Sequence, residues 1–285
     1  MRVAVISGGG AGHEPAHASY TGLGMLSASV CGEIFASPSA SQVLTAIRLG
    51  TMRQTSAGTD GDISRADTKH GPGDDPLDPL DALLIVNNYT GDRLNFGLAA
   101  EHARSIGIRL ATVVVADDVS LLSRPTLVGP RGLAGNIIVC KILGAAAARG
   151  LELEKLKKLG DAVVGSLRSV GASLEHCHVP GRTKADFQKN MIEETEYELG
   201  MGLHNEPGVR RMSLEGGEMM VNQMLELLVN TPAAETDKDT TKLSRCVTVL
   251  FVNNLGGMSQ LEMGAVVDEI VSQLGEHPCG NVYDN

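Results

Sequence analysis

The sequence predicts an α/β protein made of two α/β units with largely parallel sheets, and three observations support this fold class. Short apolar runs have the length and the β-branched content of strands that are buried on both faces. They lie at residues 3–6, 28–30, 82–86, 109–115 and 247–252. Segments of helical length alternate with most of these runs, and they lie at residues 15–25, 41–49, 95–106, 136–148, 152–170, 213–229 and 261–274. Polar or glycine-rich turns follow several strands, at the edge where open parallel sheets bind ligands.

The first predicted strand runs directly into a glycine-rich segment. Four of the five residues from Gly8 to Gly12 are glycine. Such a run lets the backbone turn with positive φ and lets another molecule approach the main chain closely. Pro15 suits the first position of a helix, because its φ is already helical and its missing N–H would be unpaired there. We therefore expect a strand, a bare loop and a helix, with His13 at the tip of the loop.

Three known motifs come close to this segment but do not fit it. A Walker A loop needs a lysine after its second glycine, but the position five residues on from Gly8 is His13 and no lysine follows. The dinucleotide-binding pattern would need its third glycine at that same position. Residues 13–17 match the zinc-protease pattern His-Glu-x-x-His, but Pro15 begins the helix and leaves His13 outside it. We expect no metal here and no chemistry at His17.

The composition argues against several classes of function. The 285 residues carry a net charge of −10, and only 3% of them are aromatic, with no tryptophan. Nucleic-acid binding favours a basic face and stacking rings, so it is not expected. No apolar run approaches the roughly 18 residues of a membrane-spanning helix, and no signal peptide precedes the first strand. We expect a cytoplasmic protein without a membrane partner.

The five cysteines are scattered and form no Cys-x-x-Cys pair. This pattern fits a reducing compartment, in which thiols pack as small apolar groups. The stretch His176-Cys177-His178 resembles a small metal cluster. Neighbouring side chains of an extended chain point to opposite faces, however, so an ordinary surface loop is the favoured interpretation.

We place the domain boundary near residue 170. Residues 1–170 form the first α/β unit and residues 171–285 the second, and the long helix predicted at 152–170 bridges them. Residues 50–81 are rich in Gly, Asp, Thr, Ser and Pro and nearly lack large apolar side chains. Such a stretch cannot bury enough surface to offset the entropy of ordering it, so we expect a disordered insertion.

The candidate functional residues are His13, Asp92 and His204. Gly-His-Glu-Pro at 12–15 is echoed by His-Asn-Glu-Pro-Gly at 204–208, which suggests one histidine loop in each unit. Imidazole can act near neutrality as a base, an acid or a nucleophile, and a carboxylate that follows a buried strand can accept a proton. Each residue alone also fits an ordinary surface loop or turn. The residues themselves therefore indicate a small-ligand site between two α/β units and no more.

Five segments together resemble the K domain of dihydroxyacetone kinases, and they follow the family's order over almost the whole chain. They are Ser-Gly-Gly-Gly-Ala-Gly-His-Glu-Pro-Ala-His-Ala at 7–18, Asn-Tyr-Thr-Gly-Asp-Arg-Leu-Asn-Phe-Gly at 88–97, Asp-Asp-Val at 117–119, Arg-Gly-Leu-Ala-Gly at 131–135 and Glu-Leu-Gly-Met-Gly-Leu-His at 198–204. Taken together these motifs are highly specific.

The resemblance implies a covalent substrate site. The family's histidine at the position of His204 adds through its tele nitrogen to the carbonyl of dihydroxyacetone and forms a hemiaminal, which orients the substrate. Asp92 would take the proton from the hydroxyl that is phosphorylated. His13 would hydrogen-bond the substrate and assist proton transfer, and the backbone at Gly10 would line the pocket.

The resemblance also implies that the phosphoryl donor comes from elsewhere. In the family, ATP and magnesium sit on a separate L domain or L subunit, and some bacterial relatives use a phosphotransfer relay instead. This chain shows no nucleotide loop, and phosphoryl transfer needs metal ions that hold the donor phosphates. Alone it should bind the triose without phosphorylating it. Family members are often dimeric, so a homodimer is a further expected partnership.

The chain departs from the family pattern in three places. Asn87 stands where the family usually has a substrate-contacting lysine, and it offers neither the charge nor the reach of that lysine. The family also has residues before the first motif and after the last predicted helix, so the domain looks truncated at both ends. These departures keep an alternative open, in which the chain is a catalytically impaired triose-binding or regulatory protein that retains the K-domain site.

Overall fold

The structure, a computed structural model, describes residues 3–52, 80–122, 128–181, 191–231 and 248–276. The chain divides into two compact units. The first comprises residues 1–86, 90–114 and 137–161, and the second comprises residues 87–89, 115–136 and 162–285. Most of the insertion expected at 50–81 lies outside the described residues.

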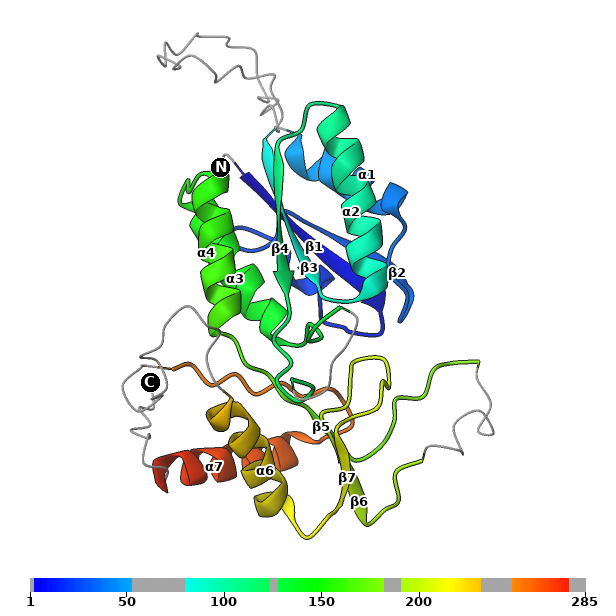
Figure 1. The fold of residues 1–285 in the computed structure, drawn as a ribbon, viewed down its shortest axis with the longest axis vertical. Helices are drawn as coiled ribbons and strands as arrows, with labels where there is room; N and C mark the ends of the chain where they lie inside the picture. The colour runs from blue at the N-terminus through cyan, green and yellow to red at the C-terminus, as the bar shows by residue number, and fades with distance from the viewer. Residues whose placement is uncertain (1–2, 53–79, 123–127, 182–190, 232–247, 277–285) are drawn as a thin grey trace, which may run out of the picture. The chain divides into compact units, whose positions relative to one another are not determined.

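The first unit contains a four-stranded sheet with helices on both faces, as Figure 1 shows. Its strands, in the order β2-β1-β3-β4, are β1 (Val3–Ala11), β2 (Ala28–Ile34), β3 (Asp81–Asn87) and β4 (Leu110–Val115). Both neighbours of β1 run parallel to it. The helices are α1 (Ala40–Thr51), α2 (Thr90–Ser105), α3 (Gly135–Ala148) and α4 (Leu153–Ser166). The expected α/β class is confirmed.

Alternation along the strands builds the core of this unit. Even-numbered residues of β1 and β3, such as Ile6 and Leu84, pack with α1 and α2 in one buried cluster that includes Ile47 and Phe96. The intervening residues are also fully buried, and α3 and α4 lie on that side of the sheet in Figure 1. A strand buried on both faces reads as a continuous apolar run, which is why the sequence showed these strands clearly.

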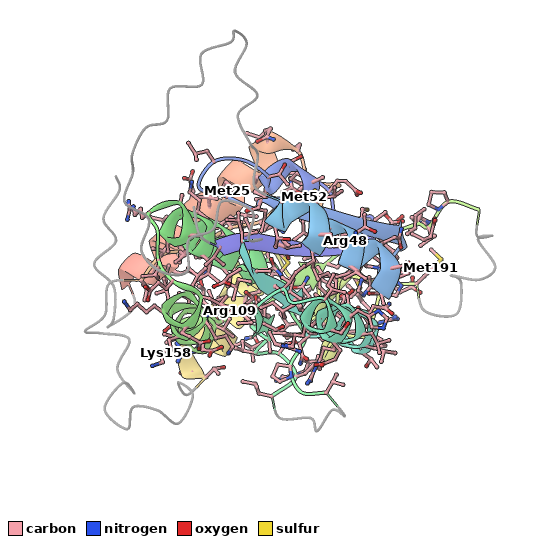
Figure 2. All side chains as sticks on the ribbon, turned by 90° about the horizontal axis from the view of Figure 1, so that it is seen from above. Met25, Arg48, Met52, Arg109, Lys158 and Met191 are labelled. Carbon is pink, nitrogen blue, oxygen red and sulfur yellow. The ribbon has the colours of Figure 1, made fainter. Side chains whose placement is uncertain are left out.

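Helix α1 begins and ends with residues suited to those positions. Ser39 and Gln42 form a capping box, in which each side chain satisfies the other residue's backbone N–H. Arg48 lies in the last turn, where a positive charge complements the helix dipole, and Figure 2 labels it beside Met52. The helix predicted at 41–49 is therefore confirmed, with slightly wider bounds.

The glycine-rich segment is not a bare loop, because β1 continues through it to Ala11. Gly8 pairs with Val30 of β2 and is buried. A Cβ at Gly8 would collide with the Val30 carbonyl, and one at Gly10 would come within 2.8 Å of the Ala36 nitrogen. The glycines thus allow a close approach, as expected, but the approaching group is the protein's own backbone.

Two helix predictions need correction near the candidate residues. The helix expected at 15–25 is replaced by turns and the short 3-10 helix η1 (Ala18–Tyr20), after which Gly22 and Gly24 adopt positive φ and the chain cannot continue helically. Helix α2 begins at Thr90, five residues before the predicted start. Asp92 therefore lies in the first turn of a helix and not in a turn before one.

In its described residues, the second unit has a three-stranded sheet and two helices. Its strands are β5 (Ala172–Ser173), β6 (Glu196–Leu199) and β7 (Arg210–Ser213), and its helices are α6 (Gly217–Asn230) and α7 (Gln260–Glu276). Both strand pairs are antiparallel, which differs from the expected parallel pairing. An antiparallel connection can be short, and the turn that joins β6 to β7 carries His204.

The strand predicted at 247–252 is wrong for the residues described, 248–252, which are irregular and half-exposed or exposed. Val249 is 84% exposed. A strand forms only with a partner ladder, and the part of the second unit that the structure describes offers these residues none. Among the described residues, no helix is long and apolar enough to cross a membrane.

Candidate functional site

His204 lies in the turn between β6 and β7, beside the carboxylate of Glu206. Its Nδ1 is 2.7 Å from Glu206 Oε1, and its backbone N–H donates to Glu206 Oε2 at 2.9 Å. One carboxylate therefore holds both the ring and the main chain of the same residue. With the ring proton on Nδ1, the imidazole carries its available lone pair on Nε2, so Nε2 is the nucleophilic nitrogen of this tautomer.

The surroundings of Glu206 favour its charged form. Burial raises the pKa of the Glu206 carboxyl, but the hydrogen bonds from the ring and the backbone of His204 outweigh burial and lower it overall. The ring of Tyr89 meets the ring of His204 edge to face, with centroids 4.8 Å apart. Burial, followed by the charge of Glu206, raises the pKa of Tyr89, so its hydroxyl stays protonated.

The turn that carries His204 is held at both ends. Gly208 N–H donates to Glu198 Oε1 at 2.5 Å, and Val209 N–H donates to the carbonyl of Leu199 at 2.8 Å. The side-chain amide of Asn205 bonds both the N–H and the carbonyl of Cys177, each at 2.8 Å. These bonds fix the backbone on either side of His204, so its ring is presented by a well-defined turn.

A buried ion pair lies behind this turn. Asp118 Oδ2 accepts from Arg131 Nε at 2.7 Å, and its side chain is fully buried while that of Arg131 is 10% exposed. The Arg131 guanidinium also donates through Nη2 to the carbonyl of Gly200 at 2.5 Å. A buried charge is tolerated only when it is paired and hydrogen-bonded, and both conditions are met here.

Asp117, which precedes Asp118 in the chain, caps a helix. Asp117 accepts from the backbone N–H groups of Leu133, at 2.7 Å, and Gly135, at 3.0 Å, where α3 begins. Burial raises the pKa of Asp117, and these two hydrogen bonds and one from Ser169 oppose that effect. Asp117 and Asp118 of the Asp-Asp-Val motif therefore have separate tasks, one at a helix end and one at Arg131.

Asn87 is engaged in a buried amide pair. Its Oδ1 accepts from Asn136 Nδ2 at 2.7 Å, and both residues are buried. A Cβ at Gly132 would come within 2.8 Å of the same Asn87 oxygen. The space around this amide is therefore already filled by the protein.

In the first unit, His13 stacks on a strained aromatic residue. The His13 and Phe35 rings lie 5.4 Å apart and are inclined by 23°. Phe35 has φ of 56°, an unusual value for a bulky residue, and its Cε1 would be 2.5 Å from a Cβ at Gly12. Glu14, next to His13, turns its carboxylate back to the Gly12 N–H, at 3.0 Å from Oε2.

Asp92 and Gly10 complete the candidate residues of the first unit. Asp92 is 7% exposed and lies in the first turn of α2, where the helix dipole favours a negative charge. Gly10 is buried in β1. His13, Gly10 and Asp92 thus belong to one unit, and His204 and Asn87 to the other.

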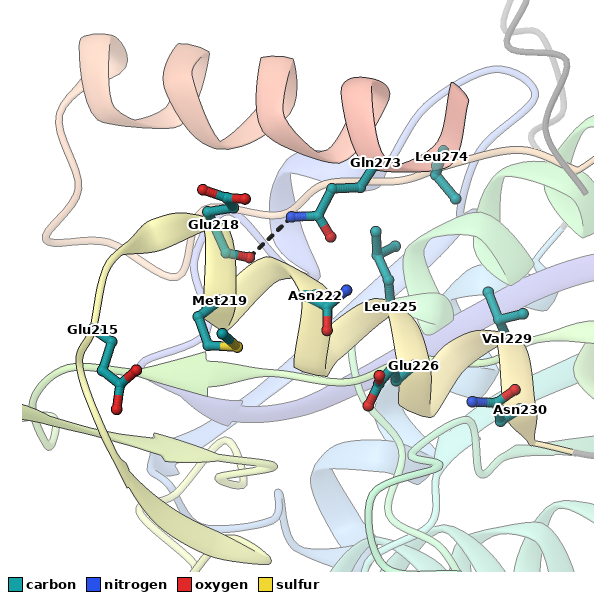
Figure 3. A pocket seen from close by; sticks show the side chains of 10 residues that line it. All are labelled: Glu215, Glu218, Met219, Asn222, Leu225, Glu226, Val229, Asn230, Gln273 and Leu274. Atoms are coloured by element: carbon teal, nitrogen blue, oxygen red, sulfur yellow. Dashed lines mark hydrogen bonds between the residues drawn. The ribbon is translucent and has the colours of Figure 1, made fainter. Parts of the chain in front are cut away.

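Within the described ranges, no group of three or more His, Cys, Asp or Glu side chains could hold a metal ion. His176 approaches Glu198 at 3.4 Å, whereas Cys177 and His178 are exposed. A groove of about 620 Å³ lies between α6 and α7, with Glu215, Glu218 and Glu226 among its lining residues, and Figure 3 shows Gln273 bonding the Glu218 carbonyl across it. No candidate residue lines this groove.

Sequence reasoning missed the roles of Glu206, Arg131 and Tyr89. The spacing His-x-Glu could have pointed to Glu206, because two residues in a tight turn can bring their side chains together. The Asp118–Arg131 pair has no such local signal, since thirteen positions separate its members. Tyr89 lies inside the motif at 88–97, but its contact with His204 depends on the fold.

Comparisons with known proteins extend over nearly the whole chain. Dihydroxyacetone kinase 2 of Saccharomyces cerevisiae is 40% identical over 276 residues, which cover 96% of this chain and 41% of the yeast protein. The human triokinase/FMN cyclase is 41% identical over 273 residues, again 96% of this chain and 42% of the human protein. The chain spans about two-fifths of the length of these curated relatives.

Solved structures match as well. The native dihydroxyacetone kinase of C. freundii aligns with a TM-score of 0.74 and 38% identity, over 95% of this chain and 42% of that one. The dihydroxyacetone kinase operon co-activator DhaQ aligns with a TM-score of 0.76 and 27% identity, over 95% of this chain and 73% of that one.

The Dak1 domain profile matches residues 1–59 and 78–283. It covers both units and every segment that carried the resemblance found in the sequence. The expected relationship to dihydroxyacetone kinases is confirmed: this chain belongs to the Dak1 domain family.

Proposed function

We propose that this chain is the substrate-binding K-type part of a dihydroxyacetone kinase, and that it holds dihydroxyacetone as a hemiaminal on His204. The observation that carries the proposal is the hydrogen bond between His204 Nδ1 and Glu206, because it directs the lone pair to Nε2. The names of the relatives, dihydroxyacetone kinase and triokinase, support the same substrate class. A covalent bond to the carbonyl would also distinguish the triose from glycerol, which has none.

In this proposal the residues of the first unit serve proton transfer. Asp92 would accept the proton of the hydroxyl that is phosphorylated, and the dipole of α2 suits a carboxylate at its first turn. His13 would hydrogen-bond the substrate, and Gly10 would contribute backbone to the pocket. Substrate would also meet Asn87, although the oxygen of that amide is already bonded to Asn136.

ATP and magnesium belong, in this proposal, to a separate L domain or L subunit. A kinase of this family from C. freundii was solved with AMP-PNP and Mg²⁺, which supports their use by such enzymes. The glycine run of this chain does not suit phosphate binding, because it is a strand packed against Val30 and Ala36. We therefore derive no phosphoryl-transfer step on this chain.

A second candidate function is triose sensing or regulation without catalysis. Asn87 in place of the family's lysine favours it, since the amide is committed to Asn136. The likeness to the operon co-activator DhaQ supports it too, because a protein of this fold carries that name. Both candidates share the proposed site at His204 and differ in whether phosphate transfer follows.

Intact-protein mass spectrometry with dihydroxyacetone tests the shared step. We expect the mass of one dihydroxyacetone on the full chain, mapped to His204 and lost in His204→Ala. A kinase assay with ATP, Mg²⁺ and an added L subunit then separates the two candidates. An adduct with turnover supports the kinase, an adduct without turnover supports the regulator, and no adduct on the folded wild type overturns both.

A further inference from the structure

We propose that Glu206 and Arg131 are positioning residues for His204: Glu206 sets the tautomer of the ring and balances its charge in the adduct, and Arg131 fixes the turn that holds Glu206. This inference rests on the proposed function and deepens it. It gives a role to two residues that form no bond to the substrate themselves and act through His204. The contacts within the second unit carry it.

The carboxylate of Glu206 orients the His204 ring. Glu206 Oε1 faces His204 Nδ1 at 2.7 Å while Oε2 accepts the His204 backbone N–H at 2.9 Å, so the carboxylate is held from two directions. A carboxylate only accepts, so the proton of this bond belongs to the ring nitrogen. Free imidazole would otherwise exchange between its two tautomers. The edge-to-face contact with Tyr89 limits rotation of the same ring.

Glu206 also balances the positive charge that the His204 ring gains in the adduct. When the Nε2 lone pair forms the bond to the carbonyl carbon, the π pair of the carbonyl moves to oxygen, which takes one proton from solvent. The ring, still protonated on Nδ1, becomes an imidazolium. A carboxylate 2.7 Å from Nδ1 stabilises that cation, as an aspartate does for the histidine of a serine-protease triad. Glu206 therefore stabilises the cationic adduct more strongly than it stabilises the neutral, unmodified ring.

Arg131 supports the turn that carries Glu206. Arg131 is anchored by Asp118 and reaches the Gly200 carbonyl with Nη2. Its Nη1 would lie 2.6 Å from a Cβ at Gly202, and the same Cβ would collide with Glu206 Oε2. Arg131 and Glu206 therefore approach the turn at one point, which only glycine leaves open.

This arrangement explains why the cation is an arginine. The planar guanidinium bonds a carboxylate and a carbonyl at once and keeps its charge at any working pH, whereas a lysine offers a single flexible ammonium. These contacts fix the geometry of the turn before any substrate arrives.

The test begins without substrate. Long-range ¹H–¹⁵N correlation spectra of the ¹⁵N-histidine-labelled full chain, at a pH where imidazole is neutral, should show the His204 proton on Nδ1, with His204→Gln providing the assignment. Glu206→Ala should move that proton toward Nε2. Glu206→Gln, which keeps an oxygen acceptor without the charge, should retain Nδ1–H. A wild-type ring protonated on Nε2 overturns the proposal.

The second measurement is adduct formation at matched dihydroxyacetone concentrations. Loss of the charge should weaken the adduct about tenfold or more in both Glu206 variants, since hydrogen bonds to charged groups are the stronger class. Arg131→Lys, which keeps a cation at a buried site, should weaken it by a smaller factor while the far-ultraviolet circular dichroism stays native. Glu194→Gln and Arg210→Lys alter exposed side chains and serve as matched controls.

The outcomes separate the two levels of inference. Equal adduct in wild type and Glu206→Gln overturns the charge-balancing role, and equal adduct in wild type and Arg131→Lys overturns the anchoring role. A wild type that forms no adduct but shows an Nδ1–H tautomer that depends on Glu206 overturns the proposed function alone. In that case the positioning of the ring stands as a structural property of the turn.

Discussion

Two turns in this chain carry a histidine within similar local sequences, but their structures differ. In the first unit, His13 is followed directly by Glu14, and that carboxylate turns away to cap the Gly12 N–H. In the second unit, one residue separates His204 from Glu206, and the carboxylate bonds the ring. With one residue inserted, the glutamate bonds the imidazole as well as the backbone N–H of the histidine.

The neighbouring aromatic rings sharpen the contrast. His13 lies almost parallel to Phe35, which covers a face of the imidazole, whereas Tyr89 meets His204 at 75°, edge to face. The His13 ring is held by stacking on Phe35, and the carboxylate of the adjacent Glu14 bonds the backbone. A ring oriented by a carboxylate is suited to nucleophilic attack. The two turns thus support different roles for the two histidines.

The largest expected effect is on covalent binding, and it compares the two histidines directly. His204→Ala removes the nucleophile and should lower adduct formation at least about 100-fold, to background. His13→Ala should leave the adduct in place and, once an L subunit and ATP are supplied, slow phosphorylation by about 10²–10⁴-fold. Intact mass and a coupled kinase assay measure the two quantities. An adduct that survives in His204→Ala but not in His13→Ala would reverse the assignment.

The next effect is on stability, and it asks how much of the His204 turn depends on its buried anchor. Arg131→Met leaves Asp118 charged and unpaired in the interior and should lower the free energy of unfolding by about 3–5 kcal/mol. Arg104→Met breaks a surface pair with Glu101, in which the side chains are 44% and 72% exposed, and should cost at most about 1 kcal/mol. Urea denaturation gives both values. Similar losses in the two variants would mean that the buried pair has no special role.

A third effect tests the backbone of the His13 turn. Gly12→Ala places a Cβ against Phe35 at a residue with φ of 97° and should destabilise the chain by about 1–3 kcal/mol. Gly97→Ala is the matched substitution on the exposed side of α2, where a Cβ meets nothing within 4 Å. It should stabilise the chain by about 0.5–1 kcal/mol, because alanine is the better helix former. Thermal unfolding would contradict this account if both changes had the same sign.

The comparison also shows what the sequence could predict. Strands β3 and β4 and helices α1, α3 and α7 were expected within a few residues, because apolar patterning is a local property and survives in the fold. Strand β1 was expected too, but it continues through the predicted loop to Ala11. Strands β6 and β7 were not expected, since their charged residues Glu198 and Arg211 conceal the pattern; the two lie opposite each other across the ladder. The run at 247–252 had the composition of a strand, but strand formation also needs a partner.

The residues of the candidate site also fall into those that the sequence indicated and those that it did not. His13, Asp92 and His204 were indicated by residue type and position and given roles by the family resemblance, and the structure places each on a defined turn or helix start. The partners of His204 were not found. Glu206 needed the shape of the turn, and Arg131 reaches the turn from a segment about 70 positions away in the chain, through the Gly200 carbonyl. Roles that depend on non-local contacts are the part that residue spacing does not reveal.

The smallest effect concerns pH and isolates the His204–Glu206 contact. Hydrogen bonds from His204 lower the pKa of Glu206 in the folded chain, so its contribution to stability is present above the unfolded pKa, near 4.5, and is lost as the pH falls through the lower folded value. Because the carboxylate is 34% exposed, the contribution should be under about 1 kcal/mol. Glu206→Gln should therefore flatten the fall in stability below pH 4.5, as measured by urea midpoints.

The double variant gives the control for this prediction. If the shift arises from His204, then His204→Ala should already remove most of the pH-dependent difference, and adding Glu206→Gln should change little more. An additive result would mean that groups other than the His204 ring, such as the His204 backbone N–H, lower the pKa of Glu206. The pair would then be a contact of two independent side chains, and the distinction between the two histidine turns would rest on aromatic geometry alone.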